Sequence, residues 1–124
     1  MLFRSLNIWG YNPINYFSPM RRFASSDELG AAIVEFKELV KEFHRNGIEV
    51  IMDVVYNHTG ENGYQADPIS FKGIDHPTYY MLDGNNNPMD FSGCGNTFNC
   101  NNPVTKDFII SSLRYWVTEM HVDG

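Results

Sequence analysis

The residues best suited to chemistry stand in one short run, Asp53-Val54-Val55-Tyr56-Asn57-His58. Asp53 lies within a stretch of valine, isoleucine and methionine, where an ionised carboxylate is costly unless it is paired or hydrogen-bonded. Asn57 and His58 follow where that apolar stretch gives way to a loop. Because ligands collect at the carboxyl ends of strands in α/β proteins, the three side chains predict a polar site at a strand end. The alternative is that Asp53 only braces a loop and that Asn57 and His58 form a turn.

A second candidate lies near the N-terminus, where Trp9 and Tyr11 flank Gly10 and Pro13 follows. Proline and glycine at this density prevent a helix, so we expect the end of a strand followed by an ordered loop. If the strands are parallel, this loop opens at the same edge as His58. A flat aromatic ring there could stack on the apolar face of a sugar, whereas packing in the core is the alternative for either aromatic.

The element that would lead into the polar run is a helix. Apolar side chains recur at helical spacing over residues 27–46, which gives the helix one apolar face. Ser25 and Glu28 fit the capping box of a helix N-terminus. Asn46 and Gly47 supply the left-handed residue that ends a helix.

The elements that follow complete the order of an α/β protein. Residues 48–56 are almost continuously apolar, which predicts a parallel strand covered on both faces. A glycine-rich loop is expected over residues 57–102, and loops of that length are often functional. Asn102 and Pro103 suit the start of a second helix, in which we assign Trp116 to the core.

These elements are too few to close a parallel sheet. One strand, the end of another and two helices would leave both apolar helix faces uncovered. We therefore expect the 124 residues to be a piece of a larger α/β protein. A complete small domain with loops at its ends is the alternative.

Composition excludes several classes of protein. The net charge of −6 argues against a nucleic-acid partner, because phosphates demand a basic face. No apolar run approaches the ~20 residues that span a bilayer. Two cysteines, Cys94 and Cys100, are too few for a disulfide framework or a four-thiolate zinc site. They are expected as free thiols, with a regulatory disulfide as the alternative.

The run Asp53-Val54-Val55-Tyr56-Asn57-His58-Thr59 resembles the first signature region of glycoside hydrolase family 13, the α-amylase family. The aromatic segment over residues 9–19 resembles the loop after the second barrel strand of that family. Residues 91–99 and 114–124 are most similar to isoamylase-type debranching enzymes of glycogen and starch. The resemblance covers nearly the whole chain.

The resemblance implies a partial (β/α)₈ barrel, within the α/β class. The chain would hold the end of strand two, helix two, strand three, the long excursion over residues 57–102, and helix three, with all of residues 1–124 inside the catalytic domain. Tyr11 matches the aromatic that stacks on the sugar before the scissile bond, and His58 matches a histidine that hydrogen-bonds a hydroxyl of that sugar. Asp53 matches an aspartate that organises the site. Asn57 matches a calcium-binding position of many α-amylases, which debranching enzymes need not share, so no metal and no cofactor is assigned.

The activity that the resemblance implies is cleavage of α-1,6 branch linkages in glycogen or starch by a retaining mechanism. The family's nucleophile stands in a Phe-Arg-x-Asp motif after Val-Asp-Gly, which would place every catalytic carboxylate beyond Gly124. The 124 residues alone are therefore expected to be inactive. The expected partner is a branched α-glucan, with neither nucleic acid nor membrane. The expected location is the cytoplasm, or a plastid if the source is a plant. A non-catalytic glucan-binding homologue, a pullulanase and an α-amylase are the alternatives.

Overall fold

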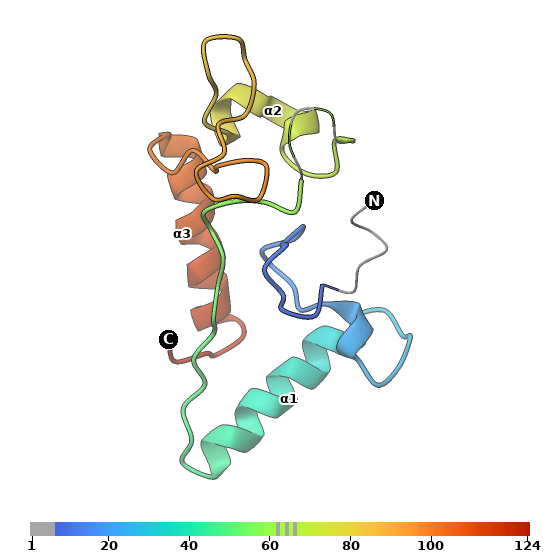
Figure 1. Cartoon of the computed structure of the whole chain (residues 1–124). Helices are drawn as coiled ribbons and strands as arrows, with labels where there is room; N and C mark the ends of the chain where they lie inside the picture. The colour runs from blue at the N-terminus through green and yellow to red at the C-terminus, as the bar shows by residue number, and fades with distance from the viewer. Residues whose placement is uncertain (1–6, 62, 64, 66) are drawn as a thin grey trace. The chain divides into compact units, whose positions relative to one another are not determined.

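The computed structural model describes residues 7–61, 63, 65 and 67–124. The chain divides into two compact units: the first unit comprises the chain up to Ile14 together with Val54–Ile109, and the second unit comprises Asn15–Asp53 and Ile110–Gly124. The helical elements are η2 (Arg21–Phe23), α1 (Ala31–Arg45), α2 (Lys72–Tyr79) and α3 (Pro103–Thr118), as Figure 1 shows. None of the helices in the described ranges is long and apolar enough to span a bilayer.

The helix predicted over residues 27–46 is present as α1, but it begins at Ala31. The predicted capping box is wrong. The backbone N–H and the hydroxyl of Ser25 both donate to the Glu35 carboxylate, at 2.9 and 2.6 Å, so a charged acceptor inside the helix replaces Glu28. Gly30 precedes the helix with φ 85°, a left-handed conformation that separates residues 27–29 from the helical turns.

The C-terminal end of α1 follows the prediction. Gly47 has φ 70°, and the N–H of Ile48 donates to the carbonyl of Phe43 at 3.0 Å while the N–H of Gly47 donates to that of His44 at 3.0 Å. This pair of bonds is the Schellman arrangement that closes a helix on a glycine.

The strand predicted over residues 48–56 is not formed. In the described part of the chain, two backbone hydrogen bonds join this segment to the residues after α3. The N–H of Met52 donates to the carbonyl of Gly124 at 2.8 Å, and the N–H of Asp123 donates to the carbonyl of Val50 at 2.9 Å. Ile51 is 76% exposed. A parallel strand needs hydrogen-bonding neighbours along its length, and an apolar sequence alone does not supply them.

The predicted end of a strand before Trp9 is also absent, since the described residues there form turns and bends. Both predicted helices are therefore present, whereas no strand forms among the residues that the structure describes; isolated bridges join Tyr80 to Phe98 and Leu82 to Pro88. The structure thus supplies the helical part of the expected α/β class without its sheet.

The second unit is organised around one buried cluster. Val40 of α1 packs with Trp116 of α3 and with Met120 and Val122, which follow α3. The rings of Phe36 and Trp116 meet edge to face at 5.5 Å. Trp116 also donates from Nε1 to the carbonyl of Tyr16 at 2.9 Å, so the prediction that Trp116 is a core residue is confirmed.

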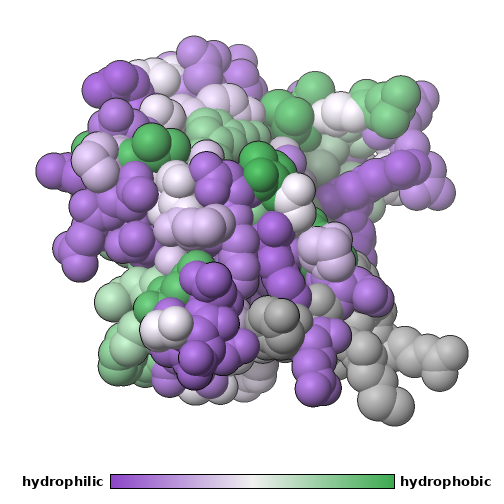
Figure 2. Space-filling view, turned by 90° about the horizontal axis from the view of Figure 1, so that it is seen from above, coloured by the Kyte–Doolittle hydropathy of each residue, from purple (hydrophilic) through white to green (hydrophobic). Residues whose placement is uncertain are grey.

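Other apolar side chains of the helices remain on the surface. The exposed ones include Val34 and Leu39 of α1, Ile110 and Val117 of α3, and Leu29 just before α1. Figure 2 shows hydrophobic residues scattered between hydrophilic ones. The expectation that the two helices lack sufficient cover is consistent with this exposure.

The first unit holds a helix that the sequence did not predict. Within the expected loop over residues 57–102, α2 spans eight residues and is kinked at Asp75, where φ is −155°. Pro77 lies inside it, which hid the helix from a periodicity argument. The start of α3 agrees with the prediction, because Asn102 Oδ1 accepts the N–H of Val104 at 2.9 Å.

Four aromatic rings pack beside α2 in the first unit. Phe71 stacks on Tyr79 at 4.3 Å and meets Phe98 and Phe108 at 5.3 and 4.9 Å between ring centroids. This cluster joins α2, the start of α3 and the end of the long loop. It gives the loop its own small apolar core.

Candidate functional site

The N-terminal loop of the first unit is fastened to the segment His58–Gly60. The Nε2 atom of His58 lies 2.7 Å from the backbone oxygen of Tyr11. The N–H of Gly60 donates to the carbonyl of Pro13 at 2.9 Å. A Cβ atom on Gly60 would lie 3.1 Å from the oxygen of Asn12 and 3.2 Å from that of Pro13, so a side chain at this position would crowd the close approach of the two backbones.

His58 is buried, with 6% of its surface exposed, and both of its ring nitrogens have partners. Nδ1 lies 2.5 Å from Oδ1 of Asn57. A backbone carbonyl can only accept a hydrogen bond, so Nε2 carries a hydrogen and donates it to Tyr11. The imidazole therefore fixes the backbone of Tyr11 as well as its own orientation.

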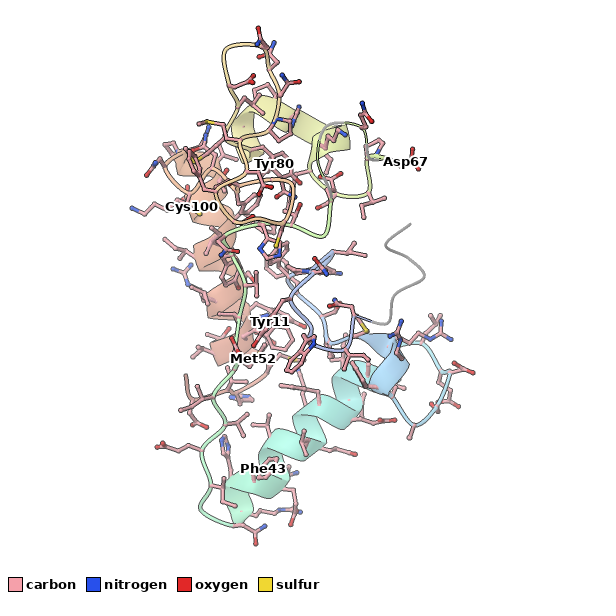
Figure 3. The ribbon with its side chains drawn as sticks, viewed as in Figure 1. Tyr11, Phe43, Met52, Asp67, Tyr80 and Cys100 are labelled. Carbon is pink, nitrogen blue, oxygen red and sulfur yellow. The ribbon has the colours of Figure 1, made fainter. Side chains whose placement is uncertain are left out.

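The aromatic side chains of this loop are accessible. Tyr11 is 42% exposed and Trp9 is 83% exposed. Figure 3 shows Tyr11 on the N-terminal loop. The alternative that these aromatics are core residues is thus wrong for Trp9, and Tyr11 is partly exposed.

Beneath this surface a polar network holds the segment Thr59–Glu61. The N–H of Thr59 donates to Asn96 Oδ1 at 3.0 Å, and Asn96 Nδ2 donates back to the carbonyl of Thr59 at 3.2 Å and to that of Glu61. The hydroxyls of Thr59 and Tyr80 lie 2.8 Å apart. Thr59, Glu61, Tyr80 and Asn96 are all buried, so each of these bonds is shielded from water.

The carboxylate of Glu61 is the charged centre of this network. Oε1 accepts the N–H groups of Ile69 and Ser70, each at 2.8 Å. Oε2 accepts the N–H of Lys72 at 2.9 Å and the hydroxyl of Tyr80. Burial alone would raise the pKa of Glu61, but the hydrogen bonds from Tyr80 and from the three backbone N–H groups outweigh burial and hold that pKa below its ordinary value.

Sequence reasoning missed Glu61, Tyr80 and Asn96 because none of them stands out within a loop rich in glycine and asparagine. Glu61 follows His58 by only a few residues, but that proximity does not reveal its donors. These donors come from the segment that leads into α2, which was not predicted.

The candidate residues are distributed over both units. Tyr11, Asn57 and His58 lie together in the first unit, joined by the two bonds of the imidazole. Asp53 belongs to the second unit and is exposed, so the expectation that it lies buried inside a strand is wrong. Its carboxylate lacks the covered sheet that would have buried it.

Asn57 and the cysteines carry no sign of a metal site. The side-chain oxygen of Asn57 is engaged with His58, and no metal-binding group of three His, Cys, Asp or Glu residues occurs within the described ranges. Cys94 and Cys100 are free thiols in this structure, as expected.

Comparison with known proteins gives a consistent result. The family described as alpha amylase, catalytic domain, matches residues 3–94. Isoamylase SU1, chloroplastic, from Zea mays is 58% identical over 122 residues, which covers 96% of this chain and 16% of that protein. Pullulanase from Bacillus acidopullulyticus has a TM-score of 0.84 at 43% identity, covering 94% of this chain and 14% of its own.

A pullulanase from Anoxybacillus sp. LM18-11, solved as a complex with maltotetraose, has a TM-score of 0.84 at 36% identity and covers 94% of this chain and 16% of its own. The chain therefore spans a small part of the length of each relative that it matches.

The pKa of Glu61 leads to a prediction about acid stability. Because folding lowers this pKa, the ionised carboxylate contributes its full stability above the unfolded value of 4.5 and loses it as the pH falls below that value through the folded pKa. We expect Glu61→Gln to lower the free energy of unfolding by about 1–3 kcal/mol at pH 7, because the amide nitrogen replaces one oxygen and the two donors to that oxygen lose their acceptor. The difference in free energy of unfolding between this variant and the wild type should become smaller at acidic pH.

The measurement is urea unfolding at a series of pH values from neutral to acidic. Glu38→Gln, at an exposed position of α1, is the control and should change little at any pH. A gap between wild type and Glu61→Gln that stays constant across the series would contradict the assignment of a lowered pKa to Glu61.

Proposed function

This chain belongs to the alpha-amylase family, and from that premise we propose that it forms part of the sugar-binding site of a glycosidase. The whole protein would hydrolyse α-1,6 branch linkages in glycogen or starch with retention of configuration. The observation that carries this proposal is the fastening of the Tyr11 loop onto buried His58. It joins two distant signature segments of the family in one place.

The proposed fold follows from the same premise. Residues 1–124 would be a portion of a (β/α)₈ catalytic domain in which α1 and α3 are helices two and three. Residues 48–56 would become strand three when neighbouring strands pair with them, and residues 57–102 would be the excursion that follows. The similarity to solved pullulanases at a TM-score of 0.84 supports this proposal.

The chemistry proposed for the site divides between its residues. The exposed Tyr11 ring would stack on the sugar before the scissile bond, since a sugar ring presents an apolar face. His58 orients the loop through Nε2; in the sugar complex this same N–H would exchange the Tyr11 carbonyl for a hydroxyl of that sugar as charge develops in the transition state. Asn57 would hold the imidazole through Nδ1. The role proposed for Asp53, that of organising the site, rests on the resemblance alone.

The catalytic carboxylates are proposed to lie outside these 124 residues. In a retaining glycosidase one carboxylate attacks the anomeric carbon while a carboxylic acid protonates the departing oxygen. Water then releases the covalent intermediate with help from the same acid, now acting as base. Tyr11 and His58 would hold the sugar in place for both steps.

The substrate proposal draws on the names of the relatives. The Zea mays relative is an isoamylase, and the Anoxybacillus pullulanase was solved with maltotetraose. For the present chain we propose a branched α-glucan. The proposed location is the cytoplasm, or a plastid if the source is a plant. The word chloroplastic in the name of the plant relative supports the plastid.

Debranching by the whole protein tests this function. We expect the whole protein to release linear glucan chains from glycogen or amylopectin, and the isolated 124 residues to release none, because the proposed nucleophile and acid lie elsewhere. Chain-length analysis of the products is the measurement. Binding without release would favour the non-catalytic homologue, whereas short oligosaccharides from unbranched amylose would favour an α-amylase.

The roles of the two signature residues can be tested in the whole protein. We expect His58→Ala to lower kcat/KM by roughly 10- to 1000-fold, or about 1.4–4 kcal/mol, through loss of a hydrogen bond and of the Tyr11 anchor. Tyr11→Ala should weaken glucan binding. Steady-state kinetics on a branched glucan is the measurement, with circular dichroism to verify folding.

Lys41→Ala is the control, since Lys41 is exposed on α1, and its kinetics should match the wild type. If folded His58→Ala retained wild-type kcat/KM, the imidazole would be only a turn residue and the proposed sugar site would be excluded.

A further inference from the structure

We infer that Glu61 and Tyr80 are positioning residues that fix the His58–Gly60 backbone and thereby hold the Tyr11 loop in its place. This inference rests on the proposed function for its consequences in sugar binding. The structural arrangement itself consists of hydrogen bonds within the first unit.

The first step is the attachment of Glu61 to the segment before α2. Its carboxylate accepts three backbone N–H groups, those of Ile69, Ser70 and Lys72. Charge-assisted bonds to backbone donors are stronger than neutral ones and are directional. Glu61 thus joins the residues next to His58 to a helix that lies further along the chain.

The second step is the bridge through Tyr80. The Tyr80 hydroxyl donates to Oε2 of Glu61, and a phenol has one hydrogen to donate. The Thr59 hydroxyl, 2.8 Å from the Tyr80 oxygen, must therefore be the donor in that contact. The order of hydrogens from Thr59 to Tyr80 to the carboxylate is consequently fixed by the charge on Glu61.

The third step connects this network to the sugar site. Thr59 lies between His58 and Gly60, the two residues that bond the Tyr11 and Pro13 carbonyls. The Asn96 side chain bonds the backbone of Thr59: its oxygen accepts the Thr59 N–H, and its nitrogen donates to the Thr59 carbonyl. Any shift of the Thr59 backbone would therefore be transmitted to both attachments of the Tyr11 loop.

Burial separates this role from a direct one. Tyr80 and Glu61 are each 2% exposed, so neither offers a polar atom to a ligand that arrives from solvent. Figure 3 shows Tyr80 among the loop segments beside α2. Small displacements of groups that orient a substrate are costly, since a shift of about 1 Å can reduce a rate ~100-fold.

A double-mutant cycle in the whole protein tests the inference. Tyr80→Phe removes the bridging hydroxyl and keeps the ring. We expect it to weaken binding of maltotetraose about tenfold in the wild-type background, but less than about twofold when His58 is already alanine, because residues that act through one another are not additive. Tyr79→Phe removes a hydroxyl from the neighbouring residue, whose ring packs against other aromatic rings, and should have little effect in either background.

If Tyr80→Phe weakened maltotetraose binding by the same factor in both backgrounds, the inference would be overturned, because the hydroxyl would then act independently of His58. If Tyr80→Phe fails to fold, Thr59→Val removes the other hydroxyl of the Thr59–Tyr80 contact. Its effect on maltotetraose binding is then measured with and without His58→Ala.

Hydrogen exchange separates failure of this inference from failure of the proposed function. A wild-type protein that does not bind maltotetraose would count against the proposed sugar site. In that case the Gly60 amide, which donates to Pro13, still decides the positioning role. We expect about tenfold faster exchange of this amide in Tyr80→Phe, as for loss of one network bond, with α1 amides unchanged. Unchanged exchange at Gly60 would overturn the inference.

Discussion

A buried carboxylate is the constraint on which the first unit depends. Glu61 would be costly to desolvate in isolation, and its two oxygens are satisfied by three backbone N–H groups and one phenol. Meeting this requirement fixes residues 69–72 and thus the start of α2. Phe71, within this segment, packs its ring against Phe98 and Phe108. An acidic side chain in a loop therefore accounts for much of the local architecture.

The same network extends to the proposed sugar site. Thr59 bonds to Tyr80, the partner of Glu61, and Asn96 bonds to the backbone of Thr59, the residue after His58. At Gly60 the two backbones approach so closely that an added Cβ atom would crowd the oxygens of Asn12 and Pro13. The loop that carries the partly exposed Tyr11 is therefore attached to a buried polar network. This arrangement suits a stacking residue, because pre-ordering the ring lowers the entropy lost on binding.

The sequence predicted those features that depend on local chemistry. Gly47 ends α1, Asn102 caps α3 and Trp116 is buried, each for the physical reason that its residue type suggests. The resemblance also paired Tyr11 with His58, and the two are in contact. Features that depend on distant partners could not be predicted. Glu35 takes the place of Glu28 as the partner of Ser25, and residues 48–56 form no continuous sheet. The backbone donors to Glu61 come from the segment that leads into α2 and from its first residue, and that helix contains Pro77.

A crystal structure of the whole protein with maltotetraose would test the central claim most directly. The account predicts a glucose ring lying flat on the Tyr11 side chain. It also predicts His58 beneath the Tyr11 loop, with Nε2 within hydrogen-bond reach of the Tyr11 carbonyl or of a sugar hydroxyl, and the Glu61–Tyr80–Thr59 contacts intact. A sugar bound elsewhere, with Tyr11 and His58 apart, would contradict it.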